Sequence, residues 1–123
     1  MTLQEAKKPL WEPTEEQKQN ANATHYMQWL AQNRDVHVST RAELWQWSVE
    51  HLEDFWASLW DYFHIEASKP YTTVLQERKM PGAVWFSGAE LNYAQHAFRH
   101  ASSEHPAIVF RSERVPMREG VVG

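Results

Sequence analysis

The fold is organised around residues 80–92, which read Met-Pro-Gly-Ala-Val-Trp-Phe-Ser-Gly-Ala-Glu-Leu-Asn. This stretch holds two of the chain's four glycines, Gly82 and Gly88, on either side of Trp85 and Phe86. Glycine reaches the positive φ angles that tight turns need, and large rings supply most of the area that a short segment can bury. The pattern therefore predicts an aromatic plug held in a tight, irregular connection.

Two capping boxes predict where helices begin upstream of this plug. Thr14 and Gln17 form the first, and the helix that it opens is expected to run to about Gln32. Thr40 and Glu43 form the second, at the start of a short helix. Apolar residues of the first helix recur at intervals of three and four, which predicts one buried stripe. This stripe consists of Ala23, Tyr26, Met27 and Leu30.

Ser48 is expected to cap a third helix, which is the most strongly periodic segment of the chain. Its apolar side chains fall on one broad face, formed by Phe55, Trp56, Leu59, Trp60 and Phe63. Burying five such side chains contributes on the order of 10 kcal/mol. Ordering about 15 residues costs a comparable amount. We therefore expect this helix to be stable only against a partner surface, with Trp56 in the core.

The second half of the chain is expected to mix loops, a helix and strands. Residues 66–79 are polar and predict a loop, with a short strand or turn at 71–75. Helical spacing returns in residues 90–101. The apolar run at 106–112 predicts a strand, with a hairpin partner at 115–119. The expected fold class is mainly α with a short C-terminal β-hairpin.

Composition bounds the class of protein. The 123 residues allow one domain with a modest core, and we expect a flexible lead at 1–13 followed by one folded segment at 14–123. A net charge of −4 without a basic block predicts no nucleic-acid partner and no polybasic membrane contact. The sequence shows no membrane-spanning apolar run, no signal-peptide pattern and no cysteine, which favours a cytoplasmic protein. Seven tryptophans indicate a core rich in indole rings.

Residue patterns that could form a metal site or a phosphate-binding loop also have simpler structural interpretations. His96 and His100 lie four residues apart on a predicted helix and could share a metal ion, but the spacing supplies no third ligand, so a solvated or packed helix face is expected. Gly82 and Gly88 are isolated, and no lysine follows Lys79, which predicts turns rather than a phosphate-binding loop.

Charged residues near helix ends are expected to stabilise those ends. The pairs Glu15-Glu16 and Glu53-Asp54 lie in predicted first turns, and His64 lies at a predicted helix terminus. The tryptophans leave an alternative open, in which their rings form a binding surface rather than a core. This aromatic set consists of Trp45, Trp47, Trp56, Trp60 and Trp85. The chain would then be a free-standing helical interaction module that binds a protein partner or a second copy of itself.

Aromatic and turn motifs follow one another along roughly residues 9 to 119. They are Leu10-Trp11-Glu12-Pro13, Tyr26-Met27-Gln28-Trp29-Leu30, Leu44-Trp45-Gln46-Trp47-Ser48-Val49-Glu50, Asp54-Phe55-Trp56, Met80-Pro81-Gly82-Ala83, Trp85-Phe86, Gly88-Ala89, Leu91-Asn92-Tyr93-Ala94 and Ala107-Ile108-Val109-Phe110-Arg111-Ser112-Glu113. In this order, they resemble the start of acetoacetyl-CoA synthetases, which are AMP-forming ligases of the adenylating superfamily.

The resemblance implies a helical N-terminal cap of an α/β adenylate-forming domain, in an enzyme of lipid metabolism. Such enzymes join acetoacetate to CoA using ATP and Mg²⁺, and release AMP and diphosphate. The family's Ser/Thr/Gly-rich nucleotide loop, its later acidic and aromatic motifs and its C-terminal lysine have no counterpart in this sequence. The resemblance therefore implies no catalytic, cofactor-binding or metal-binding residue here.

Residues 119–123, Glu-Gly-Val-Val-Gly, stand where the family continues into a Ser/Thr-Trp-x-x-Leu helix. We therefore expect the segment to stop before the nucleotide-binding core. On this interpretation the chain is a structural cap without activity on its own. Its partner would be the remainder of the ligase or a companion chain.

Overall fold

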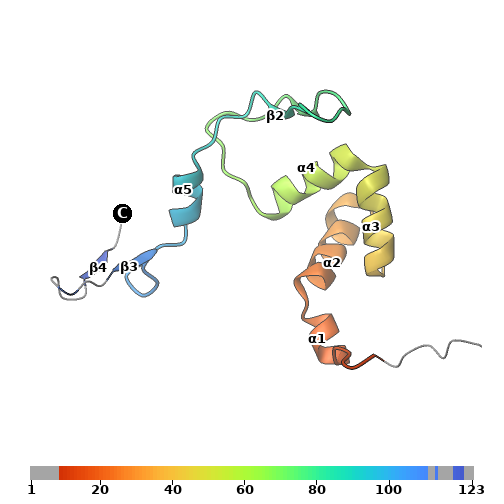
Figure 1. Ribbon diagram of the computed structural model, residues 1–123, viewed down its shortest axis with the longest axis horizontal. Coiled ribbons are helices and arrows are strands. Elements are labelled where there is room, and N and C mark those ends of the chain that lie inside the picture. The colour runs from red at the N-terminus through yellow and green to blue at the C-terminus, as the bar shows by residue number, and fades with distance from the viewer. Residues whose placement is uncertain (1–8, 111–112, 114–117, 121–123) are drawn as a thin grey trace, which may run out of the picture. The chain divides into compact units, whose positions relative to one another are not determined.

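The computed structural model describes residues 9–110, 113 and 118–120, and the chain divides into two compact units, residues 1–62 and 63–123 (Figure 1). The first unit contains four helices, α1 (Glu15–Gln19), α2 (Asn22–Arg34), α3 (Arg41–Glu50) and α4 (Leu52–Tyr62). The second contains β1 (Thr73–Leu75), β2 (Trp85–Ser87), α5 (Tyr93–Phe98), β3 (Ile108–Phe110) and β4 (Arg118–Gly120). The expected class, mainly α with a short C-terminal hairpin, is confirmed. Of the expected 1–13 lead, residues 1–8 lie outside the described residues, and 9–13 form no helix or strand.

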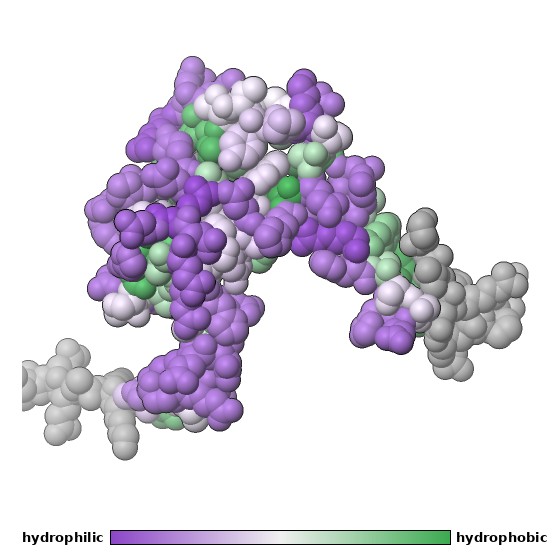
Figure 2. All heavy atoms as spheres, turned by 180° about the vertical axis from the view of Figure 1, so that it is seen from behind, coloured by the Kyte–Doolittle hydropathy of each residue, from purple (hydrophilic) through white to green (hydrophobic). Residues whose placement is uncertain are grey.

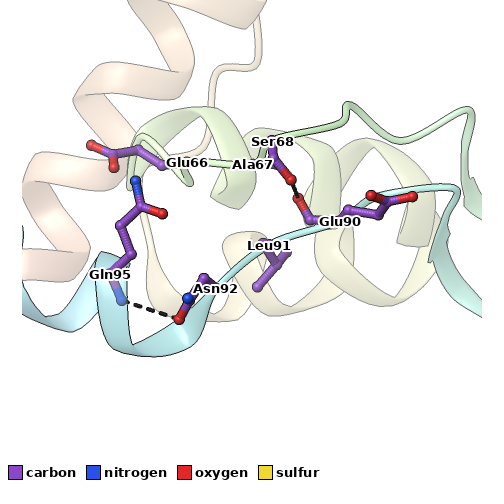
Figure 3. Close-up of a pocket in the computed structure, with 7 residues that line it drawn as sticks. All are labelled: Glu66, Ala67, Ser68, Glu90, Leu91, Asn92 and Gln95. Atoms are coloured by element: carbon purple, nitrogen blue, oxygen red, sulfur yellow. Dashed lines mark hydrogen bonds between the residues drawn. The ribbon is translucent and has the colours of Figure 1, made fainter.

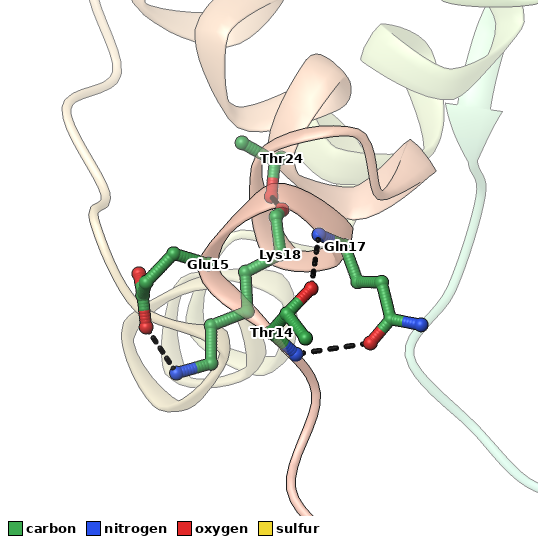
Figure 4. Close-up of polar contacts among 5 residues, drawn as sticks. All are labelled: Thr14, Glu15, Gln17, Lys18 and Thr24. Carbon is green, nitrogen blue, oxygen red and sulfur yellow. Dashed lines mark hydrogen bonds and ion pairs between the residues drawn. The ribbon is translucent and has the colours of Figure 1, made fainter.

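The first capping box forms as predicted at α1 (Figure 4). The hydroxyl of Thr14 accepts a hydrogen bond from the backbone N–H of Gln17 at 3.2 Å, and the Thr14 N–H donates to the Gln17 side chain at 2.9 Å. Glu15 and Lys18 add an ion pair of 2.7 Å across the same turn. The hydrogen bond that Lys18 donates to Glu15, and then the charge of Glu15, raise the pKa of Lys18. These contacts stabilise a helix of only five residues.

The predicted single helix from Thr14 to about Gln32 is wrong, because the chain breaks between α1 and α2. Asn20 ends α1, and asparagine favours local turns over helix interiors. The hydroxyl of Thr24 donates to the carbonyl of Lys18 at 2.5 Å, and so adds a second hydrogen bond to an acceptor at the end of α1 that the Ala21 N–H already reaches at 3.4 Å. The break leaves Ala23 exposed, although the rest of the predicted stripe is buried or half-buried.

The second capping box is also confirmed, and it is more extensive than predicted. The hydroxyl of Thr40 accepts from the N–H of Glu43 at 3.1 Å. One carboxylate oxygen of Glu43 accepts the Ser39 N–H at 2.7 Å, the Ser39 hydroxyl at 2.8 Å and the Thr40 N–H at 3.1 Å. Because these donors favour the charged carboxylate, with the Ser39 backbone contributing most, they lower the pKa of Glu43.

Ser48 does not cap a helix, so that prediction is wrong. Helix α3 continues through Ser48 to Glu50, and α4 begins at Leu52 after a break at His51. The Ser48 hydroxyl instead donates to the carbonyl of Trp45 at 2.7 Å, within its own helix. This local back-bond satisfies the hydroxyl without ending the helix.

The core of the first unit forms where α2 meets α4. Tyr26 and Leu30 on α2 and Ser58 on α4 are 6%, 0% and 0% exposed, respectively. The hydroxyls of Tyr26 and Ser58 lie 2.5 Å apart, and Ser58 also donates to the carbonyl of Phe55 at 2.7 Å. Because serine has a single hydroxyl proton, this arrangement makes Tyr26 the donor to Ser58. Rings of Trp29, Phe55 and Tyr62 surround Tyr26, with centroids 5.0 to 6.4 Å away.

The prediction that Trp56 lies in the core is wrong, because its side chain is 40% exposed. Residues two apart on a helix project about 200° from each other. Since Ser58 faces α2, Trp56 is directed to the other side of α4. A small, fully buried serine thus faces α2, and the large ring of Trp56 lies at the surface.

The second unit begins with an antiparallel pair of strands. Thr73 pairs with Ser87, and Leu75 pairs with Trp85. Leu75 is 7% exposed, whereas Trp85 is 38% exposed. The predicted strand within 71–75 is confirmed. The aromatic plug is only partly correct, because Phe86 is half-buried and Trp85 is exposed.

The turn role of both glycines in this stretch is confirmed. Gly82 and Gly88 have φ angles of 91° and 86°, which side-chain-bearing residues rarely adopt. A Cβ atom at Gly88 would lie 3.3 Å from the Thr72 hydroxyl oxygen, whereas one at Gly82 would meet nothing within 4 Å. Phe86 also has a positive φ, of 47°, and its ring contacts that of Tyr71 with a centroid distance of 5.3 Å.

Helix α5 is shorter than the predicted 90–101 span. The Asn92 side chain caps it by accepting from the N–H groups of Ala94 at 3.0 Å and Gln95 at 3.3 Å. The C-terminal hairpin is confirmed, since β3 and β4 are antiparallel and Val109 pairs with Glu119. Part of its predicted second strand, residues 115–117, lies outside the described residues.

Candidate interaction surface

Helix α3 carries apolar side chains on two sides. On the inner side, Leu44, Trp47 and Ser48 are half-buried, and the Trp47 ring meets that of Phe55 on α4 with a centroid distance of 6.0 Å. On the other side lie Ala42, Trp45 and Val49, which we call the outer face of α3. Trp45 is 62% exposed and Val49 is 45% exposed. Spacings of three and four residues place these three side chains on one helix face.

The five tryptophans that the sequence suggested as a binding surface differ in exposure and are divided between the two units. Trp47 and Trp60 are half-buried, while Trp45, Trp56 and Trp85 are exposed. Trp85 belongs to the second unit and the other four to the first. Figure 2 shows that, on the face in view, hydrophobic residues surface as small green areas among purple hydrophilic ones. Sequence reasoning grouped these rings by composition, whereas a helical projection of α3 would have separated Trp45 from Trp47.

His96 and His100 are brought together by an arginine. The guanidinium of Arg99 contacts Nε2 of His96 at 2.9 Å and donates to Nε2 of His100 at 3.0 Å. It also donates to the carbonyls of His64 at 2.7 Å and Phe63 at 3.0 Å. Because a guanidinium only donates hydrogen bonds, both imidazole nitrogens act as acceptors. The histidines thus hold a cationic side chain, which no spacing pattern in the sequence had indicated.

The structure gives no support to a metal site at these histidines. Across residues 9–110 and the shorter described stretches, no three histidine, aspartate or glutamate side chains gather where they could hold an ion. The backbone carbonyl of His64 accepts a hydrogen bond from Arg99. The helix-end role expected for the His64 side chain stays a prediction. The acidic pairs are confirmed as first-turn residues, Glu15-Glu16 in α1 and Glu53-Asp54 in α4.

Two shallow cavities lie within the individual units. One, of about 280 Å³, is in the second unit, lined by Glu66, Ala67, Ser68, Glu90, Leu91, Asn92 and Gln95 (Figure 3). The Ser68 hydroxyl donates to the Glu90 carbonyl at 2.9 Å, and Lys69 pairs with the Glu90 carboxylate at 3.3 Å. Ser68, Lys69 and Glu90 are therefore engaged in hydrogen bonds and an ion pair within the second unit. The other, of about 510 Å³, lies in the first unit beside Met27, Ala31 and Val38.

Among the described residues, the helices are too short or too polar to cross a bilayer.

Comparison with known proteins identifies the class of this segment. Residues 41–97, from the start of α3 through most of α5, match the family model described as acetyl-coenzyme A synthetase N-terminus. The chain thus carries the N-terminal segment found in acetyl-CoA-synthetase-like proteins.

Individual relatives and one solved structure narrow the class of this segment further. The chain is 32% identical over 106 residues to acetoacetyl-CoA synthetase of Gallus gallus, a match that covers 85% of this chain and 16% of the relative. It is 38% identical over 61 residues to malonamoyl-CoA synthetase of Penicillium aethiopicum, covering 48% of this chain and 8% of that relative. The solved structure of acetoacetyl-CoA synthetase from Streptomyces lividans superimposes with a TM-score of 0.71 and 41% identity, over 75% of this chain and 14% of that one. In sequence and in fold, this chain corresponds to the N-terminal segment of acetoacetyl-CoA synthetases.

Proposed function

We propose that this chain acts as the N-terminal structural segment of a ligase that joins acetoacetate to CoA. The observation that carries the proposal is its likeness to the Streptomyces lividans enzyme, at 41% identity and a TM-score of 0.71. The chain spans only 16% of the length of the Gallus gallus relative, so the reacting groups of such a ligase would come from outside this segment. ATP, CoA and Mg²⁺ would bind there too, and the expected location is the cytoplasm.

The contribution of the segment is structural on this proposal. Among the described residues, the buried hydroxyls of Tyr26 and Ser58 are paired with each other. The guanidinium of Arg99 is committed to two carbonyls and two imidazoles. These groups stabilise the fold, and a substrate would have to displace existing hydrogen bonds to use them.

A segment exchange tests this function. The chain replaces the matching segment of the Streptomyces lividans enzyme, and the chimera is compared with a version of that enzyme from which the segment is deleted. We expect the chimera to form acetoacetyl-CoA from acetoacetate, ATP and CoA, and the deletion version to lose this activity. A folded chimera that is no more active than the deletion version would contradict the proposal.

The second candidate function is that of a free-standing interaction module. The exposure of Trp45 and Val49 on one helix face favours it. Sedimentation of the purified chain discriminates between the two, because a module that binds its own copies would associate as its concentration rises. A monomer at all concentrations would remove the self-association version of this alternative.

A further inference from the structure

The outer face of α3 is unusual for a surface helix. An amphipathic helix normally buries one apolar stripe and exposes a polar side, whereas a helix that is apolar all round is buried on all sides. The inner side of α3 already packs through Trp47 against Phe55. Its outer face nevertheless adds a tryptophan that is 62% exposed and a valine that is 45% exposed. Helix α3 therefore carries apolar side chains on a second, exposed side as well as on the side that packs against α4.

The size of the outer face argues against a second copy of the chain as the missing partner. Its exposed apolar area is on the order of 300 Å², taking about 250 Å² for a whole tryptophan. A stable interface between separate proteins buries about 800 Å² on each partner. Free association also costs translational and rotational entropy, which so small a face does not offset. A partner that is already linked to the segment avoids most of that cost.

We propose that the outer face of α3, formed by Ala42, Trp45 and Val49, docks on the remainder of the ligase to which the segment is linked. This inference rests on the proposed function. The match covers only 16% of the Gallus gallus relative, which leaves most of that protein available to cover the face. The complementary surface would be an apolar recess for one indole ring, with a hydrogen-bond acceptor for the indole N–H.

Exposed polar residues on α3 provide an internal control for this face. Glu50 follows Val49 directly, is also exposed, and projects about 100° away from it around the helix. The side chain of Glu50 accepts a hydrogen bond from that of Gln46, so this flank of α3 is polar. A docked partner would cover position 49 and leave position 50 open to solvent.

Cysteine labelling tests the docking, because the sequence contains no cysteine. Val49→Cys and Glu50→Cys are made in the chain alone and in the Streptomyces lividans chimera, and the rate of maleimide attachment at each site is measured by mass spectrometry. In the chain alone, both positions should react at similar rates. In the chimera, labelling at position 49 should slow by about tenfold or more, with less than about twofold change at position 50, since thiol reactions depend on access.

Three results would overturn the inference. Equal labelling of position 49 in the chain and in the chimera would show that the ligase does not cover it. Slow labelling in a chain that sediments as a dimer would assign the face to a second copy. Slow labelling in a monomeric chain would assign it to the chain's own second unit.

A chimera that does not fold would move the same test to a tethered pair. The chain carrying Val49→Cys would be joined through a flexible linker to the Streptomyces lividans enzyme that lacks its matching segment, so that the two remain linked. Protection of position 49 in this fusion is the expected result, and its absence contradicts the docking. Activity tests the proposed function and labelling tests the face, so an active chimera that is labelled freely at position 49 would refute only this inference.

Discussion

The two units of this chain are stabilised in different ways. The first joins helices distant in sequence through buried side chains, with Tyr26 and Leu30 on α2 meeting Ser58 on α4. In the described part of the second unit, Leu75 is the one buried hydrophobic side chain, and the order comes from strand pairing and from the hydrogen bonds of Arg99. Side-chain packing thus carries the first unit, whereas backbone pairing carries the second.

This difference bears on how the segment works. A unit with its own packed core can present a helix face in a fixed orientation, which the outer face of α3 requires. A unit held by short strands keeps much apolar area exposed, including Met80 at 88% and Tyr93 at 84%. Such a unit is expected to gain more stability from a covering partner than the first unit does.

The largest effect should come from removing a core leucine. Leu30→Ala is expected to cost about 2 to 5 kcal/mol, because it leaves a cavity beneath a fully buried position. Leu75→Ala should cost about 2 kcal/mol, the lower end of that range, since strand β1 has a single neighbouring strand. Hydrogen exchange during urea unfolding should assign each loss to its own unit. If each substitution lowered the unfolding free energy of both units equally, the two units would not be stabilised separately, which would contradict this account.

The buried hydroxyl pair should respond unequally to its two deletions. Ser58→Ala leaves the buried Tyr26 O–H without its acceptor and is expected to cost about 1 to 3 kcal/mol. Tyr26→Phe leaves Ser58 still bonded to the Phe55 carbonyl and should cost about 1 kcal/mol. Urea unfolding measures both changes. A larger loss in Tyr26→Phe would contradict the assignment of Tyr26 as the donor.

The same pair predicts a dependence on alkaline pH. Burial raises the pKa of Tyr26 above its ordinary value of 10.0. The stabilisation from the neutral phenol is therefore complete below pH 10 and is lost as the pH rises through the raised pKa. Tyr26→Phe should weaken the fall in stability above pH 10. An unchanged fall in that variant would show that other groups cause it.

The glycines of the second unit provide a matched pair of changes. Alanine at either position forces a side chain into a positive φ, at an expected cost of about 1 to 2 kcal/mol. Gly88→Ala should cost more than Gly82→Ala, because its Cβ would press on Thr72 while the space at Gly82 is open. Thermal unfolding of the two variants gives the comparison, and the reverse order would contradict the β1–β2 geometry.

The smallest effect should be the acid sensitivity of the capping box at α3. Hydrogen bonds from the Ser39 backbone and hydroxyl, and from Thr40, lower the pKa of Glu43 below its ordinary value of 4.5. Their stabilisation is therefore present above pH 4.5 and is lost as the pH falls through the lowered pKa. Glu43→Gln should make the free energy of unfolding depend less on pH below 4.5. Glu16→Gln, in the first turn of α1, serves as the control and should leave this dependence on pH unchanged.

The capping boxes and the glycine turns were predictable from the sequence, whereas the helix breaks and the features that depend on tertiary contacts were not. Both capping boxes and both glycine turns follow from residues a few positions apart, and the structure confirms them. The place of Trp56 depends on which side of α4 meets α2, and hydrophobicity alone assigned it to the core. The buried Ser58, which pairs with Tyr26 on α2, has no hydrophobic signal in the sequence.

The candidate surface was missed for a related reason. The sequence placed Trp45 and Trp47 in one aromatic set, but the helix directs them to different sides. Arg99 carried no signal either, because its partners at Phe63 and His64 are backbone carbonyls more than 30 residues away. The family, by contrast, was recognisable from the order of its motifs, and the match over residues 41–97 agrees with it.

The central claim is that this chain contributes structure, and not chemistry, to an acetoacetate-CoA ligase. The most direct test is to incubate the purified chain with acetoacetate, ATP, Mg²⁺ and CoA, and to follow acetoacetyl-CoA and AMP together. The account predicts no product above that of a heat-inactivated control. Product formation that requires both ATP and the chain would contradict it, and would locate a nucleotide site within these 123 residues.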